Sequence, residues 1–277
     1  IPKKGDLLIS LSGNRFEGNI ETWAGKVSYY PGDLLCIINQ RVGILRKKKD
    51  AKIDSRYFSY LLSTIHAQKR LILIATSSGG QANLSKEQIL THEVNIHPLS
   101  QQKLIVQILE NLEKKIELNN KSNQILVDIA STLFKSWFIN FEPVKAKANA
   151  NSTGLSDKVS NLFPDSFENS ELGEIPKSWK VLKLGDVIEL KYGKALKESN
   201  RIEGQYSVFG SNRIVGSHNQ FLVKGPGIIV GRKGNPGIVN WSDKDFFPID
   251  TTFYVKPKKE IKEMTFLFFS LSHQKLQ

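Results

Sequence analysis

The fold is decided by one stretch in the middle of the chain, "LSQQKLIVQILENLEKKIELNNKSNQILVDIASTLFKSWFINF", which runs from Leu99 to Phe141. It contains neither Gly nor Pro, and it lies between Pro98 and Pro143. Proline commonly marks the boundaries of a helix, because it cannot continue one from within. The stretch therefore predicts a single long helix over residues 99–142, about 60 Å long at ~1.5 Å per residue.

Within this helix, selected positions recur in alternating steps of four and three residues, which is the spacing of a coiled-coil seam. The seam positions are Ile105, Leu109, Leu112, Ile116, Asn119, Asn123, Leu126, Ala130, Leu133 and Trp137. An ordinary core helix would not sustain a heptad for so long. The two central asparagines either fix the register with a partner helix or mark a place where the seam is open, and the sequence leaves both interpretations standing.

The segments on either side of the helix resemble each other. "GDLLIS" at 5–10, "GKVSYY" at 25–30 and "RYFSYLLS" at 56–63 follow one another in the order of "GIIVG" at 227–231, "GIVNW" at 237–241 and "MTFLFFSLS" at 264–272. Short β-like runs, including 6–10, 33–38 and 227–230, alternate with turn residues, and a helical pattern covers 57–67. We predict an α+β fold: two related mixed α/β domains, 1–98 and 171–277, joined by a long coiled-coil-type helix and by a polar linker over 143–170.

The charge of the chain is concentrated in the two lobes. The net charge of +12 divides into +6 for residues 1–99, 0 for 100–142 and +6 for 143–277. Basic lobes indicate a polyanionic partner, nucleic acid first, although a basic surface also serves solubility. Cys36 is the only cysteine, which excludes an intramolecular disulfide and fits a reducing cytoplasmic setting. No apolar run reaches the ~18 residues that a membrane span needs.

Motifs of catalysis are missing from the sequence. The five histidines are scattered, and there is no phosphate-binding Gly-Lys-Ser/Thr loop and no adenine-methyltransferase motif. Asp250, Glu260 and Lys262 give one nuclease-like pattern, but their polar surroundings are better explained by a solvated turn. We expect a non-catalytic protein without cofactor or metal.

The candidate DNA-binding residues are polar and cationic side chains on Gly-rich turns. Arg and Asn can each bond two atoms of a base edge, whereas Lys suits phosphates. The candidates are Asn14 and Arg15 in "SGNRFEGN", Gln81 and Asn83 in "TSSGGQANLS", Lys191, Lys194, Lys197 and Arg201, and Arg232, Lys233 and Asn235 in "VGRKGNPGIV". Taken singly, each turn is also explained as an ordinary surface hairpin. Repeated on two basic lobes, the turns favour contact with DNA.

Several of these motifs, in this order, resemble the specificity subunit of type I restriction-modification systems. They are "LSKEQILTHEVNIHPLSQQKLIVQIL" at 84–109, "KSWFINFEP" at 135–143, "LGEIPKSWKVLKLGDV" at 172–187, and "KGPGIIVGRKGNPG" with "FPIDTTFYV" at 224–255. The resemblance implies two target-recognition domains that each read one half of a split double-stranded DNA site. It also implies a pair of antiparallel helices that act as a ruler, and docking of methyltransferase (M) and ATP-driven restriction (R) subunits.

The chain departs from that family pattern at both ends, because nothing in the first lobe matches 171–187 and nothing in the second matches 84–141. Two other classes stay open at this stage: a stand-alone DNA-binding regulator that dimerises through the helix, and a scaffold whose helix pairs only with protein. Salt-dependent binding to duplex DNA would exclude the scaffold. A gapped, non-palindromic site would exclude the regulator, since a symmetric dimer prefers palindromes.

Overall fold

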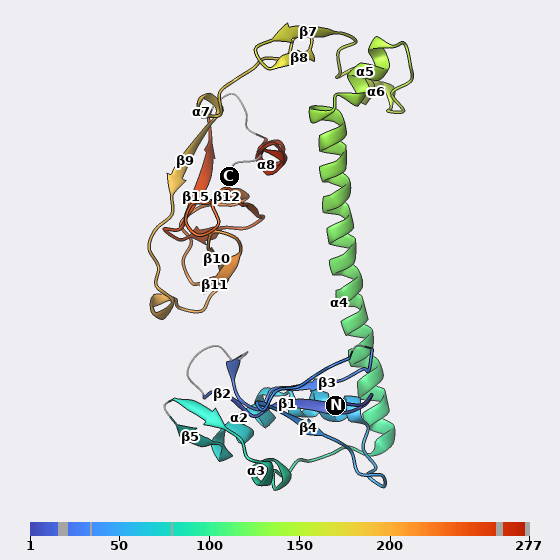
Figure 1. The fold of residues 1–277 in the computed structure, drawn as a ribbon, viewed down its shortest axis with the longest axis vertical. Coiled ribbons are helices and arrows are strands. Elements are labelled where there is room, and N and C mark those ends of the chain that lie inside the picture. The colour runs from blue at the N-terminus through green and yellow to red at the C-terminus, as the bar shows by residue number, and fades with distance from the viewer. Residues whose placement is uncertain (16–21, 34, 79, 259–262, 275–277) are drawn as a thin grey trace. The chain divides into compact units, whose positions relative to one another are not determined.

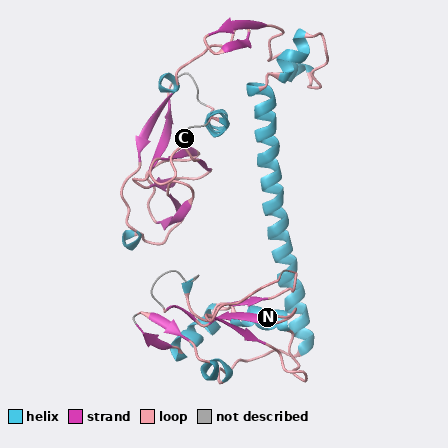
Figure 2. Cartoon of the chain, in the orientation of Figure 1, coloured by secondary structure: helices cyan, strands magenta, loops and turns pink. Residues whose placement is uncertain are grey.

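The computed structural model describes residues 1–277 except 16–21, 34, 79, 259–262 and 275–277 (Figure 1). The chain divides into two compact units, Ile1–Ser122 and Asn123–Gln277, and the long helix α4 begins in the first and ends in the second. Each unit combines strands with helices (Figure 2). The predicted fold class, two mixed α/β lobes joined by a long helix, is confirmed.

The first unit is built on two small antiparallel sheets, with strand orders β3-β1-β4 and β2-β6-β5. Its elements are β1 (Leu7–Ser10), β2 (Ser12–Asn14), β3 (Val27–Tyr29), β4 (Val42–Leu45), α1 (Ser55–Leu62), α2 (Ile65–Ile74), β5 (Thr76–Ser78), β6 (Gln81–Asn83), α3 (Lys86–Leu90) and α4 (Leu99–Phe134).

The core of the first unit lies between these sheets and α2. Ile9 of β1 and Leu71 of α2 are fully buried there, together with Ala82 and Leu84 at the end of β6. The alternation of buried and half-buried residues along β1 is the pattern of a strand with one face on a core. Gln68 of α2 is buried too, and its Nε2 donates to the carbonyls of Gly25 and Leu62, which ties α2 to the loop before β3.

Within the second unit, α4 gives way to a π-helical turn, Lys135–Ile139. Its further elements are α5 (Glu142–Ala148), α6 (Asp157–Ser160), β7 (Phe167–Ser170), β8 (Gly173–Pro176), α7 (Leu184–Val187), β9 (Ile188–Tyr192), a 3₁₀ turn (Glu198–Asn200), β10 (Tyr206–Phe209), β11 (Ile214–His218), β12 (Gly227–Gly231), β13 (Val239–Ser242), β14 (Phe246–Pro248), β15 (Thr252–Pro257) and α8 (Met264–His273).

Three sheets organise this unit: β13-β12-β15-β9, β11-β10-β14 and the hairpin β7-β8. Strand β12 is buried throughout, because α8 covers one of its faces while Phe209 and Phe246 pack against Ile229 on the other. A strand buried on both faces reads as a continuous apolar run, which is how "GIIVG" appears in the sequence.

The structure differs from the sequence-based expectations in three places. A strand was predicted over 33–38, but none forms among the described residues there. The helical pattern over 57–67 is divided into α1 and α2, because the side chain of Thr64 caps the start of a new helix. The segment 143–170, predicted as a polar linker, contains most of α5, all of α6 and strand β7. Phe141, at φ +57°, separates the π-helical turn from α5 and so ends the long helix.

Candidate nucleic-acid interface

In the first unit, strand pairing brings together amide side chains that lie far apart in the sequence. Asn14 on β2 is the cross-strand partner of Gln81 on β6, and Ser12 is the partner of Asn83. Asn14 and Gln81 are exposed, Asn83 is half-buried, and Arg15 follows Asn14 directly, half-buried. Asn14 Nδ2 donates to Thr22 Oγ1 at 3.0 Å. Two separate predicted loops therefore form one surface of amides, the groups that bond adenine edges in the major groove.

In the second unit, the turn between β12 and β13 is held tightly by its backbone. The amide groups of Arg232 and Lys233 both donate to the carbonyl of Thr251, at 2.9 and 3.1 Å, and the hydroxyl of Ser211 donates to the carbonyls of Thr251 and Lys233. A Cβ on Gly231 would lie 2.1 Å from the carbonyl oxygen of Asn235, so only glycine fits. Lys233 and Asn235 stand exposed on this fixed turn.

Arg232 is oriented by an aromatic cradle. Its Nε and Nη2 donate to the carbonyl of Asp250 at 3.2 and 2.6 Å, and its guanidinium carbon lies 5.2 Å from the ring centre of Tyr192 and 5.9 Å from that of Phe253. These contacts leave the Nη1 amino group without a partner among the described residues. A guanidinium stacked on aromatic rings loses little entropy on binding, since its direction is already set.

The other candidate DNA-binding cations of the second unit lie on β9 and on the segment that follows it. Lys191 is paired with Glu189 at 2.5 Å, and this hydrogen bond raises the pKa of Lys191 and lowers that of Glu189. Lys194 and Lys197 are exposed. Arg201 is bound to the unit's own backbone, since its Nη1 donates to the carbonyl of Val215 at 2.7 Å.

Tyr192 was not among the residues predicted from the sequence. Its side chain is 66% exposed, yet its ring packs at a tilt against Phe253, with 5.0 Å between ring centres, and the guanidinium of Arg232 lies over it. An aromatic between lysines, as in "ELKYGK", is the signal that points to such a residue. Tyr192, which follows Lys191 at the end of β9, thus contacts Arg232 of the β12–β13 turn.

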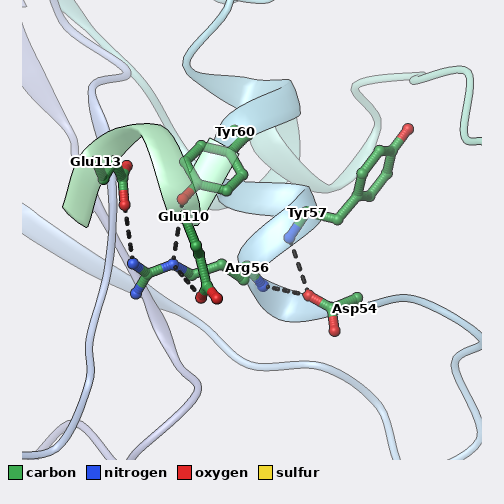
Figure 3. Close-up of polar contacts among 6 residues, drawn as sticks. All are labelled: Asp54, Arg56, Tyr57, Tyr60, Glu110 and Glu113. Atoms are coloured by element: carbon green, nitrogen blue, oxygen red, sulfur yellow. Dashed lines mark hydrogen bonds and ion pairs between the residues drawn. The ribbon is translucent and has the colours of Figure 1, made fainter. Parts of the chain in front are cut away.

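The first lobe also holds the start of α4 through a cluster around Arg56, which the sequence did not indicate (Figure 3). Arg56 forms ion pairs with Glu113 at 3.0 Å and Glu110 at 3.2 Å, and it lies 4.8 Å from the ring centre of Tyr29. Burial acts to lower the pKa of Arg56, but the hydrogen bond to Tyr60 and the two carboxylates outweigh it and raise the pKa. Asp54 caps α1 by accepting from the amide groups of Arg56 and Tyr57 (Figure 3).

A buried glutamine completes this attachment. Gln102 of α4 is fully buried; its Oε1 accepts from the amide of Asp54 at 2.8 Å, and its Nε2 donates to the carbonyl of His97 at 2.8 Å. Tyr57 Oη lies 2.6 Å from His97 Nδ1. The start of α4 is thus attached to the first lobe by polar contacts with Asp54, Arg56 and His97.

The predicted seam residues divide into two groups. Leu112, Ile116, Asn119, Asn123, Leu126 and Leu133 are exposed, which leaves them free to face a partner helix. Ile105, Leu109 and Ala130 are half-buried, and Trp137 is half-buried against Phe163. Near the first lobe the exposed apolar row runs instead through Leu104 and Ile108.

The described part of the chain holds no group of three or more His, Cys, Asp or Glu residues placed to bind a metal ion. Of the nuclease-like pattern, Glu260 and Lys262 lie outside the described residues, and the Asp250 carbonyl is engaged by Arg232. Among the described helices, none combines the length and the apolar content needed to cross a bilayer.

Comparison with known proteins identifies the family. The model for the "Type I restriction modification DNA specificity domain" matches residues 1–126 and 176–277, which covers both lobes and most of α4. The chain belongs to this family. It is 25% identical over 267 residues to the type I restriction enzyme HindI specificity subunit of Haemophilus influenzae, covering 80% of this chain and 55% of that protein.

A second relative is the type I restriction enzyme MjaIX specificity subunit of Methanocaldococcus jannaschii, 35% identical over 145 residues, which are 51% of this chain and 29% of that one. The chain thus spans about half the length of the curated relatives it matches, or less. Among solved structures, it is similar to an S subunit of a type I restriction-modification system from M. genitalium, with a TM-score of 0.43, 16% identity, and coverage of 99% of this chain and 64% of that chain.

Proposed function

We propose that this chain is the DNA-reading part of a type I restriction-modification specificity subunit, in which each lobe reads one half of a bipartite double-stranded site. The observation that carries the proposal is the repetition of one sheet in both lobes, together with hydrogen-bonding side chains that lie on the paired strands β2 and β6 in the first lobe and on the β12–β13 turn in the second. The family match to both lobes supports it. In this role the chain is non-catalytic and uses no cofactor of its own, and it acts in the cytoplasm, where its DNA is.

The two lobes would read DNA by different chemistry. The first presents Asn14, Gln81 and Asn83, whose amides suit adenine. The second presents Arg232, whose remaining N–H groups suit the O6 and N7 of guanine, beside Lys233, which suits a phosphate. The methyltransferase and restriction subunits would supply the reactions, and the exposed apolar positions of α4, such as Leu112 and Leu126, are available for the partner helix or for those subunits.

The runner-up, a stand-alone regulator that dimerises through the helix, is not favoured, because a family of specificity domains accounts for both lobes as well as the helix. The two functions differ in the site they prefer. A specificity subunit reads a gapped, asymmetric sequence, whereas a symmetric dimer prefers a palindrome.

A selection experiment tests the proposal. The chain is purified together with the methyltransferase subunits of the proposed complex, and randomised duplexes are selected at two salt concentrations. We expect enrichment of a two-part asymmetric site with a gap of fixed length, and binding that weakens steeply with salt. Enrichment of a palindrome would support the regulator, and an absence of binding to any duplex would contradict a DNA-reading role.

A further inference from the structure

The central sheets of the two lobes can be matched strand by strand through their registers. In the first lobe, Ile9 of β1 is paired with Gly43 of β4. In the second, Val230 of β12 is paired with Phe253 of β15. Helix α1 packs on β3 as α8 packs on β13. The orders β3-β1-β4 and β13-β12-β15 are therefore the same arrangement.

The turn that leads into β4 has the same backbone hydrogen bond as the turn that leads into β15. In the first lobe, the amide of Val42 donates to the carbonyl of Asn39 at 3.2 Å. In the second, the amide of Thr252 donates to the carbonyl of Ile249 at 3.0 Å. The register places Val42 and Thr252 at the same point of the sheet, so the two turns are equivalent position by position.

At this junction the two lobes place an arginine on different strands. In the second lobe, the amide of Arg232, just after β12, donates to the carbonyl of Thr251 at 2.9 Å. In the first lobe, the amide of Leu11 donates to the carbonyl of Arg41 at 2.7 Å. Leu11 therefore takes the position of Arg232, and Arg41 takes that of Thr251. Each lobe keeps one arginine here, after the middle strand in the second lobe and before β4 in the first.

Arg41 lies beside the strands that carry the amide surface of the first lobe. Its backbone partner, Leu11, accepts through its own carbonyl from the amide of Leu84, just after β6, at 2.8 Å. Farther along the same strands, Asn14 of β2 is paired with Gln81 of β6. Three residues of strand separate Asn14 from Leu11, about 10 Å at ~3.3 Å per residue. That length is the rise of about three base pairs of duplex DNA.

The backbone of Arg41 is fixed, while its guanidinium is free to bind. The amide of Arg41 donates to Asn39 Oδ1 at 2.9 Å, and its carbonyl is held by Leu11. The side chain is exposed, and it has no hydrogen bond, ion pair or ring contact with any residue that the structure describes. Arg46, beyond the other end of β4, is instead held by Asp6 at 2.6 Å. A free guanidinium on a fixed backbone suits the O6 and N7 of guanine, which it can bond together.

We propose that Arg41 is a base-reading residue of the first lobe, and that it binds a guanine close to the base contacted by Asn14 and Gln81. The proposal rests on the proposed function, because it adds a contact within the half-site assigned to the first lobe. That half-site should therefore contain a G·C pair within about three base pairs of an A·T pair. An arginine that contacts only a phosphate would add affinity without sequence preference, and this difference can be tested.

Substitutions at Arg41 separate a base contact from a phosphate contact. Arg41→Ala and Arg41→Lys are introduced into the proposed complex with methyltransferase subunits, and the methylated sites are mapped by sequencing. We expect Arg41→Ala to lower discrimination at one G·C pair by about 10- to 100-fold. Arg41→Lys should restore most of the affinity but not the discrimination, since lysine does not reproduce a bidentate guanidinium contact. Lys48→Ala, an exposed cation beyond the other end of β4, is the control and should leave every position unchanged.

A change in the DNA gives an independent test of the same contact. Replacing the guanine of that G·C pair by 7-deazaguanine removes the N7 acceptor. We expect this replacement to weaken binding of the unmodified chain about 10-fold and binding of the Arg41→Ala chain less than about twofold. The same replacement at the guanine assigned to Arg232 is the control and should weaken both chains equally, which also shows that the variant is folded.

The possible outcomes distinguish this proposal from the proposed function. A loss at all sites alike that Arg41→Lys restores would show a phosphate contact and overturn the proposal. A change confined to the half-site that Arg232→Ala alters would overturn it too. If the unmodified chain reads a bipartite site and Arg41→Ala leaves it unchanged, Arg41 is not a reading residue and the proposed function stands. An unmodified chain without sequence preference would contradict both.

Discussion

Both lobes hold the long helix with the same element of the repeated fold, but with opposite chemistry. In the first lobe, α1 contacts α4 through Arg56 and its ion pairs with Glu110 and Glu113. In the second, α8 contacts α4 through aromatic rings that surround Phe134. The register of the sheet fixes where the attaching helix lies, and the chemistry of the attachment is free to vary. The two attachments should therefore respond differently to mutation, salt and pH.

The aromatic attachment should be the more costly to break. Phe134 is 8% exposed and packs on Phe266, Phe269 and His273. Phe134→Ala leaves a cavity in this cluster, so we expect the second unit to lose about 3–5 kcal/mol of its free energy of unfolding. Urea unfolding followed by tryptophan fluorescence measures it. Leu133→Ala, at a neighbouring exposed position, is the control and should cost about 1 kcal/mol or less. Equal losses for the two substitutions would show that the aromatic cluster does not stabilise the second unit.

In the first lobe the largest loss should come from the buried amide. Gln102→Leu leaves the amide of Asp54 and the carbonyl of His97 without their partners, each worth about 1–3 kcal/mol when buried. We expect the free energy of unfolding of the first unit to fall by about 2–4 kcal/mol, as measured by urea denaturation. Gln101→Leu changes the adjacent, exposed residue in the same way and should be nearly neutral. A neutral Gln102→Leu would show that the helix start is held by other contacts.

The two attachments of α4 should respond differently to salt. The ion pairs of Arg56 are partly exposed, so Arg56→Ala should cost about 1–2 kcal/mol at low salt, stacking on Tyr29 included, and less at 1 M NaCl. Hydrogen exchange of α1 and α8, followed from low to high salt, provides the comparison. We expect salt to loosen α1 and not α8, and loosening of both to the same extent would refute the difference.

Acid should weaken the first lobe before the second. Asp6 is buried, and its hydrogen bond with Arg46 lowers its pKa below the usual value. The pKa of an aspartate in the unfolded chain is near 4. Because the pKa of Asp6 is lower in the folded protein, its carboxylate stabilises the fold at every pH above about 4, and this stabilisation is lost as the pH falls toward the folded-state pKa. The second lobe has Gly227 at the matching position and lacks this contribution. The melting temperature of the first lobe should fall between pH 5 and pH 3, and Asp6→Asn should make it less dependent on pH, with Asp50→Asn as the exposed control.

The sequence predicted those features that a local pattern encodes. The long helix follows from an uninterrupted heptad, and the repeat follows from the order of short motifs. Ile105 and Leu109 were expected to face a partner helix, yet both are half-buried near the first lobe. Periodicity shows that a face is apolar and does not show what covers it. The contacts of Arg56 with α4 and the pairing of Asn14 with Gln81 join residues far apart in sequence, which local patterns do not encode.

The most direct test of the account is the assignment of one half-site to each lobe. Gln81→Ala and Arg232→Ala are introduced separately into the proposed complex with methyltransferase subunits, and the methylated sites are mapped by sequencing. We expect each change to cost about 1–3 kcal/mol of discrimination in one half of the site, with Gln81 and Arg232 affecting opposite halves. Lys233→Ala, beside Arg232, should weaken methylation of all sites alike. Effects of Gln81→Ala and Arg232→Ala on the same half, or unchanged site preference in both, would contradict the assignment of one half-site to each lobe.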